Sequence, residues 1–463
     1  MMVMKKILII NGYSENIGDL GILHGTIRGI LDHMKGSYIH ILITDPSSAR
    51  RHVKVNQAVT FGDPLTSRED SLIVQCYNLF KVLAHVPRLM AGRKRFPVPA
   101  HPSLDAYGDA DLIISCGGGY LNDSHGIASL GCLLEILLGV MSGKKVFLLG
   151  QSIGPYNSRT MKFITGKVLD MVSLITLRDY VSVDYLESMK VARPMVKITA
   201  DFAFLLPAAD RELGISLIRS MGLEGERHLV TMTVKPWHFP GGKDPRAAIS
   251  DYICAMAGLI NHAIRRHGAT VILIPMDVEA AGEGEGKRRK SLSGIKGLAR
   301  QLVRWEKRVR SRVSNLGSER VFIDEICKRV EEGNKGRLVV VRRILSPVEV
   351  KSLVSLSWIH VATRMHSAIF ALSEGVPVLG IAYEPKLTSL MERLGLGEHV
   401  LDINQAGESD LVEMFESLWN GRDDISRRIK PGVDLLKEKA LENVAMISEA
   451  LGTDERRWPP LPL

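Results

Sequence analysis

Short runs of apolar residues recur along the whole 463-residue chain and alternate with stretches of helical character. Each run is continuously apolar rather than alternating, which is the pattern of strands buried on both faces of a parallel sheet. The sequence therefore predicts an α/β fold with two open parallel sheets covered by helices. The expected strands span residues 6–10, 39–44, 111–115, 146–149 and 174–177 in the first half, and 229–234, 270–274, 338–341, 358–362 and 376–382 in the second.

The length of the chain favours two domains, because one ordinary core rarely extends over so many residues. Pro207 closes an apolar run and precedes a polar link, which places the boundary there. We expect an N-terminal α/β domain over residues 1–207 and a C-terminal one over 208–440. A tail over 441–463 completes the predicted division.

The composition, with 45% hydrophobic and 24% charged residues, is that of a soluble globular protein. The five cysteines form no CxxC pair, which favours reduced thiols and a reducing compartment. The apolar run near the N-terminus stops at Asn11, too early for a secretory signal, and we expect no segment of membrane-spanning length. These features predict a cytoplasmic protein.

Ligands of open parallel sheets bind beyond the carboxyl ends of the strands, and the loop "NGYSENIGD" follows the first expected strand. Gly12 and Gly18 permit a close approach of the backbone, and the next helix N-terminus can hold an anion. Asn16 and Asp19 either bind the ligand or cap that helix.

A second loop, "SCGGGYLND", carries three consecutive glycines, Gly117, Gly118 and Gly119. Such a run costs backbone entropy and indicates close contact or positive φ. Asp123 follows it, either as a helix cap or as an acid, base or hydroxyl-orienting group. In a third loop, "GQSIGPY", Gln151 and Ser152 offer neutral hydrogen-bonding groups, or serve the turn alone.

The fourth loop lies in "TRMHSAIFALSEGVPVLGIAYE", where Arg364 and His366 stand between an apolar strand and a helix. A capping box at Ser346 and Glu349 starts the preceding helix and so fixes this stretch as a strand-to-helix turn. Arg forks onto phosphate or carboxylate, helix amides complete an anion cradle, and His transfers a proton. The alternative is that Arg364 pairs with a structural acid and His366 fills a gap.

Two further side chains, Arg178 and Asp179, end the strand 174–177 and either face a ligand or form an ion pair. The 14 histidines include no HxxxH on a helix and no Cys/His cluster, so we expect neither a metal nor a cofactor. The Walker A, GxSxG and GxGxxG motifs are also lacking.

Six segments carry a resemblance to a known family: "NIGDLGIL", "ADLIISCGGGYLND", "GQSIGP", "ITLRDYVSVDYL", "TADFAFLLP" and "VATRMHSAIFALSEGVPVLGIAYEPKLTSLMERLGL". Over about residues 16–396 the sequence resembles the polysaccharide pyruvyl transferase family. The resemblance implies two Rossmann-like domains facing a cleft, similar to two-domain (GT-B-like) glycosyltransferases. It implies transfer of a pyruvyl group from phosphoenolpyruvate to a sugar of a surface polysaccharide or lipid-linked glycan, as a ketal.

The family's motifs fall on residues of this chain. Its R-x-H element matches Arg364 and His366, and its R-D pair matches Arg178 and Asp179. We expect Arg364 and Arg178 to hold the anionic groups of the donor and His366 to act as general acid/base. Asp123 is the second expected catalytic residue. The other expected substrate-binding residues are Asn16, Gly18, Asp19, Gly117, Gly118, Gly119, Gln151, Ser152 and Lys386.

Two other functions fit the same architecture. A nucleotide-sugar-dependent glycosyltransferase or sugar epimerase would use the same helix-terminus phosphate cradle and would differ in its donor. A non-catalytic member of the fold would bind a glycan or a partner, against which the intact Arg364 and His366 argue.

Residues 280–317 lengthen the second domain and depart from the family pattern. Within them, residues 287–312 hold 11 Lys or Arg residues and one Glu. The spacing predicts a basic amphipathic helix that either lies on an anionic membrane surface or packs on the domain. The first option predicts peripheral attachment at the inner face of the cell membrane. Nucleic acid is not expected as a partner, because no recognised binding module accompanies the charge.

Overall fold

The structure is a computed structural model that describes residues 4–53, 58–64, 103–237, 239, 244–278 and 318–452. The predicted insertion at 280–317, with its basic segment 287–312, lies outside the described residues. Its proposed contact with a membrane therefore stays a prediction.

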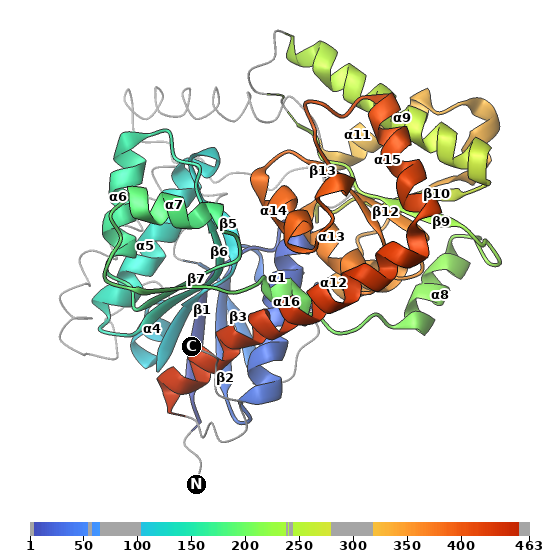
Figure 1. The fold of residues 1–463 in the computed structure, drawn as a ribbon. Coiled ribbons are helices and arrows are strands. Elements are labelled where there is room, and N and C mark those ends of the chain that lie inside the picture. Colours follow the sequence, from blue (N-terminus) through green and yellow to red (C-terminus); the bar gives the residue numbers. More distant parts are fainter. Residues whose placement is uncertain are drawn as a thin grey trace, which may run out of the picture.

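The first half of the chain builds one parallel sheet (Figure 1). Its strand order is β3-β2-β1-β4-β6-β7-β8, with β5 paired to β6, and the order reverses between β1 and β4. The strands are β1 (Lys6–Gly12), β2 (Tyr38–Ile43), β3 (Val59–Gly62), β4 (Leu112–Ser115), β5 (Gly118–Leu121), β6 (Val146–Ile153), β7 (Leu174–Leu177) and β8 (Met195–Ile198).

The second half repeats this scheme with a six-stranded parallel sheet of order β11-β10-β9-β12-β13-β14. Numbered from its own first strand, this is the 3-2-1-4-5-6 order of a Rossmann sheet. The strands are β9 (Leu229–Met232), β10 (Thr270–Leu273), β11 (Leu338–Val340), β12 (Ile359–Ala362), β13 (Val378–Ala382) and β14 (Val400–Asp402).

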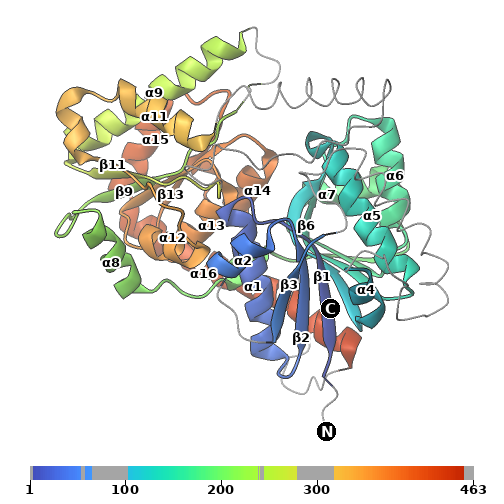
Figure 2. The ribbon, with the colours of Figure 1, turned by 180° about the vertical axis from the view of Figure 1, so that it is seen from behind.

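Helices cover both faces of each sheet (Figures 1 and 2). In the first half they are α1 (Ile17–His33), α2 (Pro46–His52), α4 (Leu104–Asp109), α5 (Ile127–Met141), α6 (Arg159–Leu169) and α7 (Val181–Ser188), with the short 3₁₀-helices η1 (Asp123–His125) and η2 (Phe202–Leu205). After them come α8 (Arg211–Ser220), α9 (Pro245–His267), α11 (Glu319–Arg329), α12 (Pro347–Val354), α13 (Met365–Leu372), α14 (Pro385–Arg393), α15 (Glu408–Asn420) and α16 (Arg422–Leu451), with η3 (Glu332–Arg337) and η4 (Gly397–His399).

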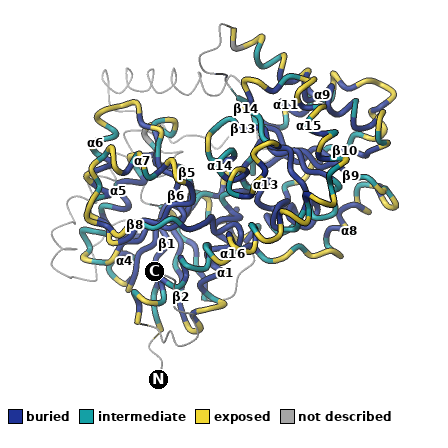
Figure 3. The backbone as a smooth tube through the Cα atoms, in the orientation of Figure 1, coloured by how far each residue is buried: buried dark blue, intermediate teal, exposed yellow. Residues whose placement is uncertain are grey.

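Alternation along β1 explains why both of its faces are apolar. Ile7 and Ile9 join the core on the side of α1 and α16, whereas Leu8 and Ile10 join a second core with α5 and α6. Successive side chains of a strand point to opposite faces, so a strand covered on both sides must be apolar at every position. Figure 3 shows the strands of both sheets buried and the outer faces of the helices exposed.

All ten predicted strands are present, with ends that differ by a few residues. The capping box is also confirmed, since Ser346 Oγ accepts from the Glu349 amide at 3.3 Å and Glu349 Oε2 accepts from the Ser346 amide at 2.7 Å. Four strands were not predicted: β3, β5, β8 and β14. The glycines of β5 disfavour a strand locally, β8 is a half-exposed edge, and β14 is three residues long.

The last helix, α16, connects the two halves. It starts beside α15 and runs back to the first half, where it packs against η2, α1 and β6 (Figure 1). The predicted start of a tail at 441 therefore lies inside a continuous helix. The division into domains at 207 agrees with the change of sheet between β8 and β9 but otherwise stays a prediction.

One helix among the described residues is long and apolar enough to cross a membrane, by length and composition, which the sequence analysis did not expect. This stretch, Arg246–His267 of α9, has 56% of its apolar window buried inside the protein. Since α9 also packs against α11 and α15, it serves as a core helix of the second half.

Candidate active site

Two helix N-termini meet at one edge of the second sheet. The neighbouring parallel strands β12 and β13 lead directly into α13 and α14. The N-cap residues, Arg364 and Glu384, make no side-chain hydrogen bond to the first turn of either helix. Backbone amides at both N-termini are therefore left for an anion, which the helix dipoles also favour.

A histidine from this edge meets an arginine and an aspartate from the first half. His366, in the first turn of α13, places Nε2 3.4 Å from Arg178 Nη1 and 3.5 Å from Asp201 Oδ2. Arg178 Nη1 donates to the same Asp201 oxygen at 2.5 Å. Arg178 follows β7 and Asp201 follows β8, so neighbouring strands of the first sheet deliver both residues.

The Asp201 carboxyl is almost fully buried. Burial raises its pKa, but the charge of Arg178 and the hydrogen bond from His366 outweigh burial and hold the pKa well below its usual range. Asp201 is therefore an anion at neutral pH that fixes Arg178 and faces the imidazole.

A chain of hydrogen bonds holds the rest of the Arg178 side chain. Arg178 Nε donates to Ser152 Oγ at 2.7 Å, and Ser152 Oγ donates to Asp179 Oδ2 at 2.5 Å. The other oxygen of Asp179 accepts from the amide and hydroxyl of Ser182 at 2.9 and 2.6 Å. Ser152 and Asp179 thus position the guanidinium, and no described residue accepts from its remaining nitrogen, Nη2.

The backbone of Gly119 in β5 lies beside two cations, because the residue has no side chain. A Cβ at this position would lie 3.4 Å from Arg178 Nη2 and 3.9 Å from Lys386 Nζ. Lys386, in the first turn of α14, pairs with Glu384 at 2.6 Å. Burial lowers the pKa of Lys386, but Tyr383 and Glu384 outweigh it and the pKa is raised, so the ammonium is charged at neutral pH.

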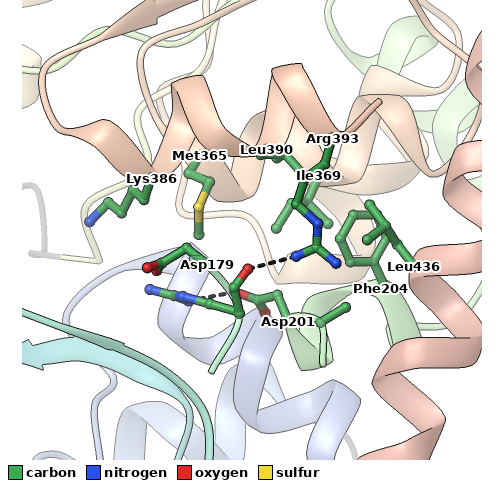
Figure 4. Close-up of a pocket in the computed structure, with 11 residues that line it drawn as sticks. Asp179, Asp201, Phe204, Met365, Ile369, Lys386, Leu390, Arg393 and Leu436 are labelled. Carbon is green, nitrogen blue, oxygen red and sulfur yellow. Dashed lines mark hydrogen bonds and ion pairs between the residues drawn. The ribbon is translucent and has the colours of Figure 1, made fainter. Parts of the chain in front are cut away.

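Residues of both halves line a pocket beside this cluster (Figure 4). Met365, Lys386 and Arg393 lie on the side of the second half, opposite Asp179 and Asp201 of the first. Arg393 donates to the backbone oxygens of Arg178 and Thr199 at 2.8 and 3.2 Å. The pocket is lined by Arg178, Asp179, Ala200, Asp201, Phe204, Met365, Ile369, Lys386, Leu390, Arg393 and Leu436.

The glycine of the first predicted loop touches the histidine directly. A Cβ on Gly18, in the first turn of α1, would lie 2.3 Å from His366 Nδ1. Only a hydrogen atom fits at this position, so the N-terminus of α1 packs directly against the imidazole.

Arg364 takes the structural alternative stated above. Its Nε and Nη2 donate to Glu319 Oε1, and Nη2 also donates to Asp277 Oδ1 at 2.5 Å. Burial raises the pKa of Glu319, which the Arg364 guanidinium opposes. Within the described residues Nη1 has no hydrogen-bond partner, so one edge of the guanidinium remains for a ligand. The substrate-binding role of Arg364 stays a prediction.

Three other predicted residues make contacts typical of local structure. Asn16 caps α1 by accepting from the Asp19 amide at 2.9 Å, and its side-chain amide donates to the Asp19 carboxylate. Asp123 Oδ2 accepts from the amides of residues 157 and 158 at 2.5 and 2.7 Å and so fastens that loop. Within the described residues no contact joins Asp123 to His366, and the expected catalytic role of Asp123 stays a prediction.

The remaining predicted residues lie deeper. Gln151 is fully buried and donates to the Cys116 carbonyl and to Tyr120 Oη at 2.6 and 2.9 Å. Gly117 packs under the Leu149 carbonyl and Gly118 against the Tyr120 ring. Of the three consecutive glycines, Gly119 alone lies beside the cations.

Sequence reasoning did not single out Asp201, Lys235, Asp277, Glu319 or Arg393. Lys235 follows β9 at the same sheet edge; burial lowers its pKa, and its charge interacts with Arg364 and Lys386. A signal existed for Asp201, because it follows β8 within "TADFAFLLP" just as Arg178 follows β7. None existed for Glu319, which begins α11 directly after the lengthened segment.

The chain is similar to known proteins over most of its length. The sequence matches the family described as polysaccharide pyruvyl transferase over residues 16–385. It is 23% identical over 449 residues to the amylovoran biosynthesis protein AmsJ of Erwinia amylovora, an alignment that covers 95% of this chain and 97% of that protein.

Solved structures share the fold at low identity. A putative UDP-N-acetylglucosamine 2-epimerase from Listeria monocytogenes superposes with a TM-score of 0.59 at 9% identity, covering 99% of this chain and 100% of that one. A glycosyltransferase from Rickettsia africae gives 0.53 at 10% identity, covering 97% and 100%. These likenesses confirm the predicted α/β fold of two Rossmann-like halves, similar to two-domain glycosyltransferases, and the match over residues 16–385 shows that the chain belongs to the polysaccharide pyruvyl transferase family.

Proposed function

We propose that this protein transfers a pyruvyl group from phosphoenolpyruvate to a sugar of a surface polysaccharide or of its lipid-linked precursor, forming a ketal. One observation carries the proposal: Arg178 and Lys386 meet beside Gly119, and Arg178 Nη1 lies 3.4 Å from Nε2 of His366. A donor with two anionic groups fits two cations and two uncapped helix N-termini.

Phosphoenolpyruvate carries two anionic groups, and the site offers two places for them. Arg178 and Lys386, with the amides of α14, suit one anion at Gly119. The amides of α13 and the remaining edge of Arg364 suit the other. Asp277 and Glu319 already balance part of the Arg364 charge. Arg364 would therefore orient the donor through a hydrogen bond more than attract it through net charge.

The reaction needs a proton on the methylene carbon of the donor. Protonation there leaves an oxocarbenium-like centre at the neighbouring carbon, to which one sugar hydroxyl adds. The bond from that carbon to the phosphate oxygen then breaks, and a second hydroxyl closes the ketal. One hydroxyl proton ends on the new methyl group and the other on phosphate. His366 lies between the two halves and is the proposed carrier of these protons.

Calorimetric titration of the purified full-length protein with phosphoenolpyruvate tests the donor. We expect binding that Lys386→Met weakens about tenfold or more through loss of a charge-assisted contact. Lys328→Met, at an exposed position on α11, is the matched control and should bind normally. UDP-N-acetylglucosamine is titrated in parallel; binding of this nucleotide-sugar without phosphoenolpyruvate would assign the protein to nucleotide-sugar chemistry instead.

His366→Gln separates binding from chemistry. We expect it to retain donor binding and to lower phosphate release from phosphoenolpyruvate by about 100-fold or more, with glycan fractions as acceptors. Turnover close to that of the unmodified protein would show that another group moves the proton.

A further inference from the structure

Three side chains with metal-binding atoms lie close together in the helices that cover the second sheet. The proposed reaction uses none of these three residues. His262 and His267 come from the last turns of α9, and Glu416 comes from α15. Both His Nε2 atoms contact the same oxygen, Glu416 Oε1, at 2.6 and 2.5 Å. The three possible ligand atoms all lie within 4.8 Å of one another.

Packing fixes the orientation of both rings. The His267 ring stacks on Trp419 with centroids 4.0 Å apart and an interplanar angle of 26°. The His262 ring stands edge-on to Phe415 at 6.4 Å and 87°. The helices α9 and α15 themselves approach closely, because Gly258 leaves room for the Glu408 carboxylate where a Cβ would collide with it. The two imidazoles are thus held toward one point rather than free to turn into solvent.

The electrostatic surroundings of the three side chains also favour a bound cation. His267 is the last residue of α9, and Gly268 ends the helix in the left-handed conformation at φ 60°. A helix C-terminus carries partial negative charge and favours a cation nearby. The Glu416 carboxylate adds a full negative charge. The side chains of His262, His267 and Glu416 are 26%, 12% and 28% exposed, so an ion can reach them from solvent.

We propose that His262, His267 and Glu416 bind a divalent transition-metal ion of the zinc class. Imidazole nitrogen and carboxylate oxygen are ligands that zinc prefers, and three protein ligands leave a fourth position for water. Around an ion with bonds of about 2.0–2.1 Å, ligand atoms stand about 3.4 Å apart. Glu416 must therefore withdraw by a little under about 1 Å, which its partly exposed side chain allows. The ion would tie the end of α9 to α15.

Sequence spacing concealed this cluster. The two histidines are five residues apart instead of four, and Glu416 lies 149 residues beyond His267. The expectation that no metal binds rested on the missing HxxxH pattern, which describes ligands on one helix face only. Here the end of a helix and a second helix supply the ligands.

The test is metal titration of the tag-free, full-length protein after treatment with a chelator. Cobalt(II) reports its own coordination through visible absorption, and zinc reports through the shift in thermal unfolding. We expect one equivalent of cobalt with a tetrahedral-type spectrum, and a zinc-dependent rise in Tm. His267→Gln should weaken affinity at least about tenfold, the least that loss of an outer partner costs a metal site. His33→Gln, at an exposed position on α1, should change nothing.

The measured quantity is the difference in Tm between metal-loaded and metal-free protein. A variant that lowers the stability of both forms equally leaves this difference unchanged and does not imitate loss of the metal site. The proposal is overturned if the unmodified protein shows neither the cobalt spectrum nor the zinc shift, or if His267→Gln keeps both. A sulfur-to-cobalt charge-transfer band would place the ion on a cysteine, such as the exposed Cys254, and would overturn it equally.

Discussion

Gly18 is the residue whose side chain, a single hydrogen atom, most tightly limits the candidate site. A methyl group there would overlap His366 Nδ1. We expect Gly18→Ala to displace the imidazole from Arg178 and Asp201 and to lower turnover by about 100-fold, since a shift of about 1 Å costs this much in enzymes. Donor binding at Gly119 should change far less. Turnover and calorimetry on the same preparation measure the two effects.

The matched control is Gly336→Ala, because nothing lies within 4 Å of a Cβ added there. It should leave turnover and Tm unchanged. If Gly18→Ala were as active as this control, the close contact between α1 and His366 would have no role in the reaction.

For single residues, the sequence identified which side chains belong to the site better than it identified their hydrogen-bond partners. It singled out Arg178, Arg364 and His366. The structure places Arg178 beside His366 where the two halves meet, and Arg364 beside Glu319. It could not show that Asp201 holds Arg178 or that Glu319 holds Arg364, because these contacts join residues far apart in the chain. A charged side chain at the end of a buried strand indicates a polar edge, whereas the partner depends on how the sheets meet.

Among the elements, the long, wholly apolar strands and the capped helices were predictable because local pattern and tertiary position agree in them. Continuous apolar runs gave the central strands of both sheets. The unpredicted β5 is stabilised from outside its own sequence: Gly118 pairs with Gln151, and Leu121 with Ile153. Its two glycines disfavour a strand by themselves, and the neighbouring β6 overrides that preference.

Helix α1 carries a buried titratable group that makes the stability of the protein depend on pH. His24 is 5% exposed, and its Nδ1 has no hydrogen-bond partner in the described structure. Burial, reinforced by Arg28, lowers its pKa from 6.5 to about 4. The unfolded chain takes up the proton near pH 6.5 while the folded protein holds His24 neutral to about pH 4. Stability therefore falls as pH falls through this window, by up to about 3 kcal/mol, and this residue adds no further loss below it.

We expect His24→Leu to flatten the dependence of the urea midpoint on pH between 6.5 and 4. The control is His33→Gln, at an exposed position on the same helix. Equal slopes for His24→Leu and the unmodified protein would show that His24 is protonated within the fold.

For the whole molecule, the question is what keeps two Rossmann-like halves at the distance that the site requires. Arg393 of α14 donates to carbonyls of the first half, directly behind Arg178. The helix α16 makes another connection, since it starts in the second half and ends against the first. Sequence periodicity could predict that a C-terminal helix exists, but not that its final turns belong to the other half's core.

Asn443 makes the docking of α16 specific. It is fully buried, and its Oδ1 accepts from the hydroxyls of Thr176 and Thr199 at 2.6 and 3.1 Å. Its Nδ2 donates to the Ala200 carbonyl at 3.3 Å. Two hydroxyls of the first sheet thus depend on one side chain of the final helix.

We expect Asn443→Ala to lower the free energy of unfolding by about 2–3 kcal/mol, because it leaves buried hydroxyls without an acceptor as well as a cavity. Glu438→Ala, at an exposed position of α16, should change it by less than about 0.5 kcal/mol. Urea unfolding measures both, and donor titration shows whether the halves keep their arrangement. Since Thr199 also offers its carbonyl to Arg393, loosening α16 should weaken donor binding without any contact to the donor. Normal donor affinity in a destabilised Asn443→Ala protein would show that the docking of α16 does not set the arrangement of the halves on which donor binding depends.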